Sequence, residues 1–406
     1  MTLRSLPFPH SAKPDARRIV AVRGLRAVAD GFAAILMPAS VLARGGGAAE
    51  VGALATATLL GSACVTLLAP RLVARFGTRR TLMGLGVLMA ATGLGFAWFD
   101  GFLPLLLVAF VGTLNPSGGD VSAFVPVEHA RLAVSVADAE RTALFARYSL
   151  AGSLLAAFGA LLAAVPQIVA QLLGVAPLTA MRAMFLLYAA IGATAAGAYA
   201  WIAVDGEVAG AVPTPLGPSR RRVWGLAALF SVDAFGGGLF VQSLLALWLL
   251  RHVGLSLAAT SSVFFWSGLL AAFSYLVAVP LARRIGLINT MVWTHLPSNL
   301  AVMAIPFVSS PAGVVALWLF RSALSQMDVP ARSSYVMAVV TPAERAAAAG
   351  ATAVPRSLAA SVAPLLAGPL FASGFGWPLL GGGALKAGYD LALLALFRRV
   401  RPPEEM

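Results

Sequence analysis

The sequence predicts an all-α integral membrane protein with 12 transmembrane helices, arranged as two pseudo-symmetric six-helix bundles. Three observations predict this fold class: the composition, a series of long apolar segments, and an internal repeat. Of the 406 residues, 59% are hydrophobic and only 11% are charged, whereas soluble proteins carry about 25% charged residues. So few charges cannot cover a water-exposed surface of this size, which leaves the lipid bilayer as the natural solvent.

Long apolar segments follow one another along the whole chain. A helix needs about 20 predominantly apolar residues to cross a bilayer. Segments of about this length are predicted at 20–43, 51–73, 81–99, 102–124, 141–165, 179–203, 223–250, 258–282, 289–308, 312–338, 346–372 and 378–397.

The distribution of arginine and lysine predicts the orientation. Cytoplasmic loops of membrane proteins are enriched in these residues. With the N-terminus inside, nearly all basic residues outside the spans lie in cytoplasmic segments, and only Arg44, Arg182 and Arg251 lie outside. We therefore expect a multi-pass protein of the plasma (inner) membrane, with both termini in the cytoplasm.

One segment, 204–222, is typical of a linker, because it is rich in proline and glycine and ends in three arginines. It divides the chain into an N-terminal six-helix half (1–203) and a C-terminal six-helix half (223–406) with a short cytosolic tail. We expect the linker to be cytosolic.

The two halves resemble each other in sequence when one is shifted by about 204 residues. Parallel six-helix repeats are a transporter architecture, in which substrate binds near the midplane and one half rocks against the other. The corresponding residues include Val125-Pro126 and Val329-Pro330, Glu140-Arg141 and Glu344-Arg345, Asp30 and Asp233, and the turns Ala74-Arg75-Phe76-Gly77 and Arg283-Arg284-Ile285-Gly286.

Charged residues inside predicted spans are candidates for function, because each costs at least about 2.5–3.5 kcal/mol to insert. Asp233 lies 11 residues after Arg222, which is about 16 Å along a helix and near the centre of the bilayer. We expect it to carry a proton or bind a cation, or to pair with Arg321 or Lys386. Asp30 is its repeat mate, with Arg26 one turn away as a possible partner.

Arg321 lies near the middle of the tenth span, where it suits an anionic substrate or a pairing with Asp233. Asp328 lies seven residues later, on the same helix face. Asp120 follows Asn115 in a stretch rich in proline and glycine, which predicts an interrupted helix that lines a cavity. Asp120 and Asp328 are alternatively gate or cap residues at the cytosolic end.

Four further polar residues belong to the predicted substrate or proton site. Lys386 and Asp390 are four residues apart on the twelfth span, and a mutual ion pair is the expected arrangement. Gln242 and Gln326 are expected to line the cavity. His295 titrates near neutral pH in principle, but its peripheral span favours a packing role.

The loop between the second and third spans carries a motif of known type. Arg75, Gly77, Arg79 and Arg80 match the arginines and second glycine of a Gly-x-x-x-Asp-Arg-x-Gly-Arg-Arg pattern, in which Pro70 and Ala74 replace the first glycine and the aspartate. In this motif, and over essentially its whole length, the chain resembles the major facilitator superfamily (MFS).

The resemblance implies the twelve-helix MFS fold and transport of a small solute by alternating access, as in bacterial drug or metabolite exporters. Arg75, Gly77, Arg79 and Arg80 are then gating residues of the cytosolic loops. The same role is expected for the repeated pairs Glu140-Arg141 and Glu344-Arg345.

Several other function classes lack the residues that they need. The sequence has no Gly-x-x-x-x-Gly-Lys-Ser/Thr loop for ATP and no Cys/His spacing for a metal, so we expect no cofactor. It also has no credible nucleophile–base pair, so we expect no enzyme activity. The net charge of +13 comes from arginines at span ends rather than from one patch, which argues against nucleic-acid binding.

The predicted function is secondary active transport of a small solute, as proton-coupled efflux by a monomer in the lipid bilayer. The alternatives are a uniporter or symporter for an organic anion that uses Arg321, and a membrane receptor that does not transport.

Overall fold

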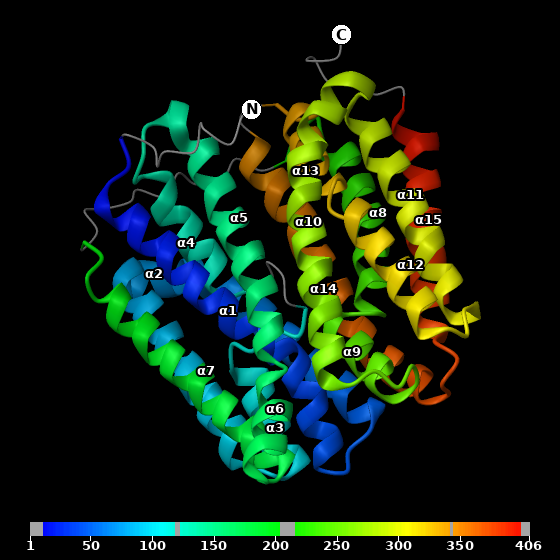
Figure 1. The fold of residues 1–406 in the computed structure, drawn as a ribbon. Helices are drawn as coiled ribbons and strands as arrows, with labels where there is room; N and C mark the ends of the chain where they lie inside the picture. The colour runs from blue at the N-terminus through cyan, green and yellow to red at the C-terminus, as the bar shows by residue number, and fades with distance from the viewer. Residues whose placement is uncertain (1–10, 118–121, 204–215, 342–343, 399–406) are drawn as a thin grey trace. The chain divides into compact units, whose positions relative to one another are not determined.

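The computed structural model describes residues 11–117, 122–203, 216–341 and 344–398. Regular secondary structure in these ranges is helical throughout (Figure 1). The helices are α1 (Pro14–Ala43), α2 (Ala48–Trp98), α3 (Phe102–Val111), α4 (Phe124–Ala133), α5 (Asp138–Leu162), α6 (Val165–Leu173), α7 (Pro177–Tyr199), α8 (Arg220–Gly238), α9 (Gln242–Arg251), α10 (Leu257–Ile285), α11 (Leu287–Ala304), the 3₁₀ helix η2 (Ile305–Phe307), α12 (Pro311–Leu324), α13 (Asp328–Ala338), α14 (Arg345–Ala372) and α15 (Trp377–Phe397).

Within the described residues, seven helical segments are long and apolar enough to cross a membrane. The longest, Ala48–Trp98, contains the second and third predicted spans, because the backbone at Gly77 leaves the helical conformation with a φ of 79°. Gly286, at the equivalent turn between α10 and α11, has a φ of 85°. Only glycine adopts such angles readily. The two turns that correspond in sequence therefore also correspond in conformation, while the count of 12 spans stays a prediction.

Other predicted spans consist of two shorter helices. The seventh is divided into α8 and α9, and the tenth into α12 and α13. Among its described residues, the fourth (102–124) is helical over α3 and at Phe124, where α4 begins. Breaks at membrane depth expose backbone groups that need partners within the protein. These spans therefore suit the lining of a cavity better than a lipid-facing surface.

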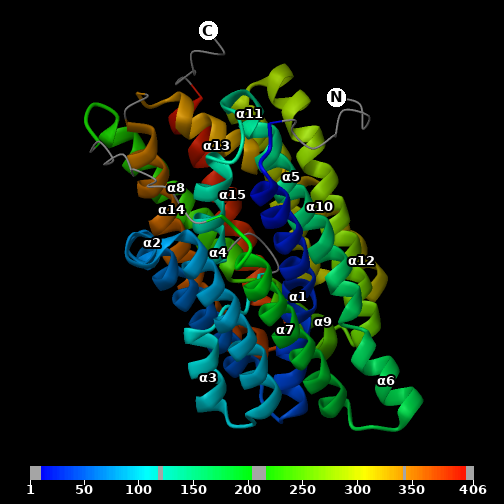
Figure 2. The ribbon, with the colours of Figure 1, turned by 90° about the vertical axis from the view of Figure 1, so that its left-hand side faces the viewer.

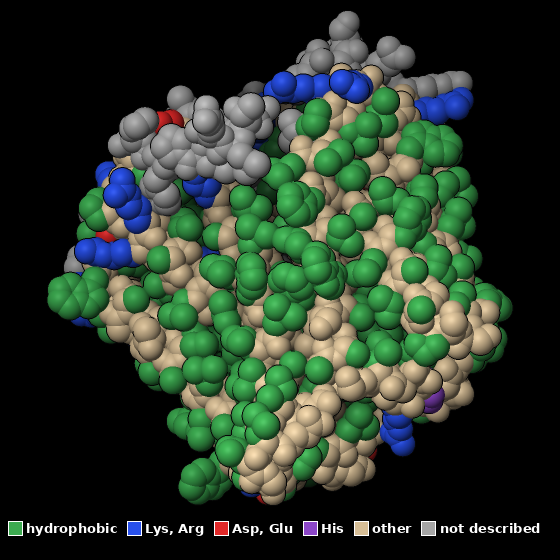
Figure 3. All heavy atoms as spheres, viewed as in Figure 1, with side chains coloured by type: hydrophobic (Ala, Val, Ile, Leu, Met, Phe, Trp, Pro, Cys, Tyr) green, Lys and Arg blue, Asp and Glu red, His purple; other side chains and the backbone are tan. Residues whose placement is uncertain are grey.

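Large apolar side chains are exposed along many helices, as expected for contact with lipid. Leu103, Leu107 and Leu396 are 70%, 67% and 65% exposed, respectively. Hydrophobic side chains also dominate the helices in the face shown in Figure 3, where lysine and arginine gather near helix ends.

The described residues belong to two compact units. Of the predicted linker, 204–222, residues 204–215 lie outside the described residues, and α8 already begins at Arg220. The first unit comprises Met1–Gly45 and Ala57–Val208, and the second comprises Gly46–Thr56 and Ala209–Met406. The start of α2 thus belongs to the second unit, where Gly52 lies against the backbone of Pro364 and Gly368 in α14.

In the first unit, α1 is the central helix and packs against α4, α5 and α7 (Figures 1 and 2). Glycines bring α1 and α5 into backbone contact: Gly31 faces the carbonyl of Ala156, and Gly159 faces that of Val28. Such small residues allow the close approach that helix association in lipid requires.

In the second unit, α8 has the equivalent position and packs against α14 and α15, while α15 also contacts α11. Gly238 faces the carbonyl of Ala360 in α14. Ala360 lies 204 residues after Ala156, so the two alanines occupy the same position of the repeat. In both units the carbonyl of this alanine contacts a glycine of the neighbouring helix. Buried residues including Phe230, Met291, Tyr335 and Leu393 form the surrounding core.

The repeated glutamates Glu140 and Glu344 both bind the chain just before the first helix of their own unit. Glu140 accepts hydrogen bonds from the amide and hydroxyl of Ser11, at 3.1 and 2.5 Å. Glu344 accepts them from the amide of Gly217 at 2.5 Å and the hydroxyl of Ser219 at 2.8 Å. Each glutamate therefore fixes the position of the residues that precede α1 or α8, a role that the sequence did not indicate.

Changing Glu344 to Gln should remove a pH-dependent contribution to stability. The hydroxyls of Thr341 and Ser219, with the amides of Gly217 and Ser219, lower the pKa of the Glu344 carboxyl from 4.5 to about 2. Because the folded-state pKa is the lower one, the stabilisation is complete above about pH 4.5 and is lost as the pH falls toward 2. The difference in unfolding temperature between wild type and variant should therefore become smaller from pH 7 to pH 4 and smaller again at pH 3. Ser219→Ala should show part of the effect, and a constant difference at all three pH values would contradict it.

Changing Gly31 to Ala should destabilise the first unit. Its new methyl group would collide with the Ala156 carbonyl, and overpacking of this kind costs about 1–3 kcal/mol. Gly84→Ala is the matched control, because no atom lies within 4 Å of the new methyl group. Thermal unfolding in detergent measures both, and equal unfolding temperatures for the two variants would refute the close α1–α5 contact.

Candidate functional site

Charged and polar side chains form one buried cluster in each unit. The Asp233 cluster in the second unit consists of Asp233, His295, Asn299, Asp328, Arg332, Lys386 and Asp390. The Glu128 cluster in the first unit consists of Arg26, Glu128, Tyr148 and Tyr199.

Asp233 in α8 is bound by two permanent cations from different helices. Its Oδ1 accepts a hydrogen bond from Lys386 Nζ in α15 at 2.5 Å, and its Oδ2 accepts one from Arg332 Nη1 in α13 at 3.0 Å. Arg332 also lies 3.3 Å from Asp328 one turn earlier in α13. All four side chains are at most 8% exposed. Their charges therefore compensate one another away from water, as buried charges must.

Asp390 in α15 has partners of a different kind. Its Oδ1 lies 2.9 Å from His295 Nδ1 in α11, and its Oδ2 accepts a hydrogen bond from Asn299 Nδ2 at 2.8 Å. His295 Nε2 is 3.9 Å from Asp233 Oδ1. His295 therefore lies between two carboxylates, rather than in a purely apolar packing position as the sequence suggested.

The predicted ion pair between Lys386 and Asp390 is wrong. The two residues share one face of α15, but this helix lies against both α8 and α11. Lys386 contacts Asp233 in α8 and Asp390 contacts His295 in α11. The expected alternative for Asp233, a pairing with Lys386, is thereby confirmed, whereas its pairing with Arg321 is not observed.

Glu128 in α4 collects three donors from three helices. Arg26 Nη2 lies 2.6 Å from its Oε2, and the hydroxyls of Tyr148 and Tyr199 donate to its two oxygens at 2.5 Å each. The Arg26 guanidinium also stacks over the ring of Phe124 at 3.7 Å. The cluster is essentially inaccessible, with Glu128 at 0% and Arg26 at 1% exposure.

Asp30 does not pair with Arg26, which turns to Glu128 instead. Asp30 is 5% exposed, and it forms no hydrogen bond or ion pair with any residue of the described part of the chain. A buried carboxylate of this kind is expensive as an anion and is a natural site for a proton.

Arg321 is a second charge without a counter-ion. Among the described residues, no carboxylate or hydrogen-bond acceptor binds its guanidinium, which lies 4.6 Å from the Trp318 ring and 5.5 Å from the Phe240 ring. Each cation–π contact contributes roughly 0.5–2 kcal/mol, so the two offset much of the roughly 2.5–3.5 kcal/mol cost of the charge on insertion scales. They supply no hydrogen-bond acceptor for the guanidinium, however.

The remaining polar candidates have local partners or lie outside the described residues. Gln326 accepts a hydrogen bond from Tyr275 at 3.0 Å, Gln242 begins α9, and Asn115 closes a turn by accepting from the amide and hydroxyl of Ser117. Asp120 lies outside the described residues.

The predicted gating residues take simple surface positions. Arg75, Arg80 and Arg345 are exposed, and Arg79 is half-buried. The side chain of Arg141 lies outside the described residues.

Glu128, Arg332, Tyr148, Tyr199 and Asn299 were not singled out from the sequence. The sequence repeat could have indicated two of them. Glu128 and Arg332 are 204 residues apart, so the repeat places an acid in one unit where the other has a base. The tyrosines and Asn299 carry no charge and gave no comparable signal, because only the helix packing brings them to a carboxylate.

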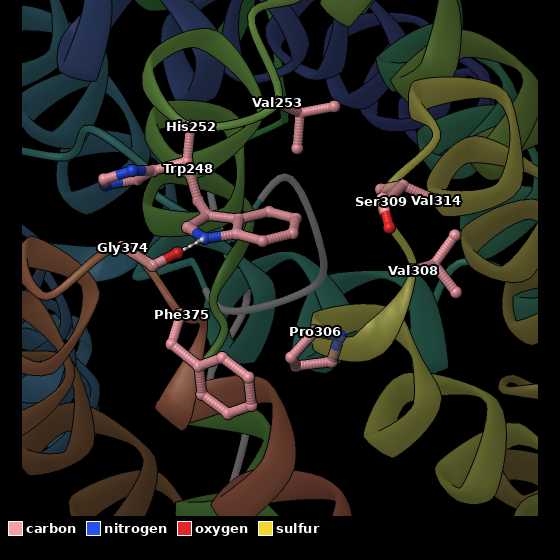
Figure 4. Close-up of a pocket in the computed structure, with 9 residues that line it drawn as sticks. All are labelled: Trp248, His252, Val253, Pro306, Val308, Ser309, Val314, Gly374 and Phe375. Carbon is pink, nitrogen blue, oxygen red and sulfur yellow. Dashed lines mark hydrogen bonds between the residues drawn. The ribbon is translucent and has the colours of Figure 1, made fainter.

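A cavity of about 340 Å³ also lies in the second unit. In Figure 4, the indole of Trp248 points to the carbonyl of Gly374, to which it donates a hydrogen bond at 3.1 Å. The lining combines apolar side chains such as Pro306, Val308 and Phe375 with polar groups such as His252 and Ser309, and it contains none of the predicted candidates. The charged clusters, rather than this cavity, therefore form the candidate site.

Among the residues that the structure describes, no group of three or more His, Cys, Asp or Glu side chains is placed to hold a metal ion.

The family model of the Major Facilitator Superfamily matches residues 20–320. The chain belongs to this superfamily. A yeast (Saccharomyces cerevisiae) relative, the uncharacterized membrane protein YJR124C, is 23% identical over 385 residues, which is 86% of each chain. The fold is also that of a D-xylose-proton symporter (14% identity, TM-score 0.76, 96% of this chain and 98% of the other) and of the human organic anion transporter MFSD10 (19%, 0.61, 94% and 100%). This MFS protein is therefore a membrane transporter and not an enzyme.

A double-mutant cycle should detect the Asp233–Lys386 pair. Asp233→Asn and Lys386→Met should each destabilise the MFS protein, because each leaves a buried charge with fewer partners. The double variant should lose less stability than the sum of the two single losses, by a coupling free energy of about 1–3 kcal/mol. Chemical unfolding in detergent measures the coupling, and the cycle of Lys386→Met with Asp390→Asn serves as the control. A larger coupling in the control cycle would contradict the observed pairing.

Proposed function

We propose that this MFS protein is a proton-coupled secondary transporter of a small solute, and that the His295–Asp390 pair is the proton site of its second unit. The observation that carries the proposal is the composition of the two carboxylate sites. Asp233 is bound by Lys386 and Arg332, whereas Asp390 is bound by His295 and Asn299. His295 lies closer to Asp390, at 2.9 Å, than to Asp233, at 3.9 Å, and imidazole is the side-chain group whose ordinary pKa lies nearest to neutral pH.

Asp233 then has an electrostatic rather than a proton-carrying role. Two cations within hydrogen-bond distance stabilise the ionised carboxylate, so a proton would have to displace at least one of them. This reassigns the role expected from the sequence, in which Asp233 was the first choice as proton carrier. The change follows from Lys386 and Arg332, both of which reach Asp233 from distant parts of the chain.

Protonation of His295 would change the contacts between helices of the second unit. A charged imidazolium lies between Asp390 at 2.9 Å and Asp233 at 3.9 Å, so it would attract both carboxylates. It would then compete with Lys386 for Asp233, which joins α8 to α15. A proton would thereby bias the packing of α8 against α11 and α15, which is the kind of link that coupled transport requires.

Asp30 is the proposed proton site of the first unit. It is buried and has no bonding partner among the described residues, so a proton is the simplest way to remove the cost of its charge. The proposal in this unit agrees with the sequence-based expectation for Asp30.

Proton coupling also has support from the comparison with the D-xylose-proton symporter. We further propose that the protein exports its solute against proton entry, as expected from the sequence. It would do so as a monomer in the plasma membrane, with both termini in the cytoplasm. The opposite direction, symport, is distinguished by the sign of the proton movement that accompanies the solute.

The proposal predicts that a pH gradient drives solute flux and that His295→Gln or Asp390→Asn abolishes this dependence. A thermal-shift screen of nucleosides, sugars and organic acids first identifies a solute, whose flux is then measured in proteoliposomes with and without the gradient. Both variants should retain solute exchange without a gradient, because they alter the proton site only. Asp100→Asn, at an exposed site between α2 and α3, is the control.

Equal wild-type fluxes with and without the gradient would exclude proton coupling altogether. A gradient-dependent flux that survives in both variants would exclude the His295–Asp390 pair and leave Asp30 as the proton site.

A further inference from the structure

Two buried hydrogen-bond donors without partners lie on one face of α12. The Nε of Arg321 and the indole Nε1 of Trp318 are both buried, and neither has a hydrogen-bond partner among the described residues. The two residues are three apart in the helix, so they are neighbours on the same face. Unsatisfied donors are rare in folded proteins and indicate a missing acceptor.

The guanidinium of Arg321 remains available for a ligand. The carboxylates whose charges act on it are those of Asp328 and Asp233. Both are already bound, Asp328 by Arg332 and Asp233 by Arg332 and Lys386. Arg321 as a whole residue is only partly buried.

Aromatic rings surround the two donors. The ring of Trp318 makes edge contacts with Phe240, just after α8, and with Phe264 in α10, at centroid distances of 6.4 and 6.5 Å. These contacts place apolar surface from three segments around the Trp318 ring, over which the Arg321 guanidinium lies. The two donors therefore favour a ligand with a negatively charged acceptor group, and the rings favour a ligand whose remaining part is apolar.

We infer that Arg321 and Trp318 bind the carboxylate of a small, singly charged organic acid, with its apolar part against Phe240 and Phe264. This inference rests on the proposed function, since it assigns the class of the transported solute. A single charge fits best because the site offers one guanidinium and one neutral N–H donor. A carboxylate fits the planar fork of arginine, which binds both oxygens.

The test measures binding of benzoate to the full-length protein in lipid nanodiscs by calorimetry at constant pH. Benzoate should bind, whereas its uncharged analogue benzamide and the cation benzylamine should not. Arg321→Met should weaken benzoate binding at least tenfold, and Trp318→Phe, which keeps the ring but removes the N–H, about threefold. Arg284→Gln, an exposed arginine at the end of α10, should leave the affinity unchanged.

Three results would overturn the inference. They are failure of wild type to bind either benzoate or hexanoate, equal benzoate affinity in Arg321→Met, and tighter binding of benzamide or phenyl phosphate than of benzoate. Because binding is measured without a gradient, these results are independent of proton coupling. Loss of gradient-driven flux with intact benzoate binding would contradict the proposed function alone.

The stability of the ligand-free protein provides a second measurement that separates a binding role from a structural one. Removing an unpaired charge should raise the unfolding temperature, so Arg321→Met should unfold above wild type. Arg332→Met should unfold below it, because it deprives Asp233 and Asp328 of a partner. A loss of stability in Arg321→Met as large as that in Arg332→Met would show a structural role and overturn the inference.

Discussion

A charge among apolar helices needs a partner, and each unit of this MFS protein is arranged around one such requirement. Asp233 joins α8 to α13 and α15 through Arg332 and Lys386. Glu128 joins α4 to three other helices through Arg26, Tyr148 and Tyr199. Apolar contact alone gives little orientation between helices in lipid, because the lipid is equally apolar. Bonds at these carboxylates therefore define which helix faces meet.

Partners of the buried charges differ in a way that matters for function. Asp233 is bound by an ammonium and a guanidinium group, Asp390 is bound by an imidazole, and Arg321 has no counter-ion in the described part of the chain. The paired groups join helices. The unpaired charge of Arg321 adds a cost without a structural return. Proteins tolerate such a cost mainly where activity requires it.

The two units of the internal repeat share their helix-packing contacts but differ in their buried charges. The glycine contacts at Ala156 and Ala360, and the glutamates Glu140 and Glu344, have the same roles in both units. By contrast, Glu128 in the first unit corresponds to Arg332 in the second. Positions that determine how backbones approach each other tolerate little change, because any added atom collides. A buried charge tolerates inversion when its partners on other helices change with it.

Composition, apolar segment length and the repeat determined the membrane location, the all-helical class and the residues most costly to bury, because these depend on local sequence and on transfer to lipid. The partners of those residues depended on tertiary structure alone. Lys386 and Asp390 are neighbours in sequence, yet they bind Asp233 and His295 on two different helices. Contacts one turn apart compete with contacts between helices, and only helix packing decides which side chains come within bonding distance.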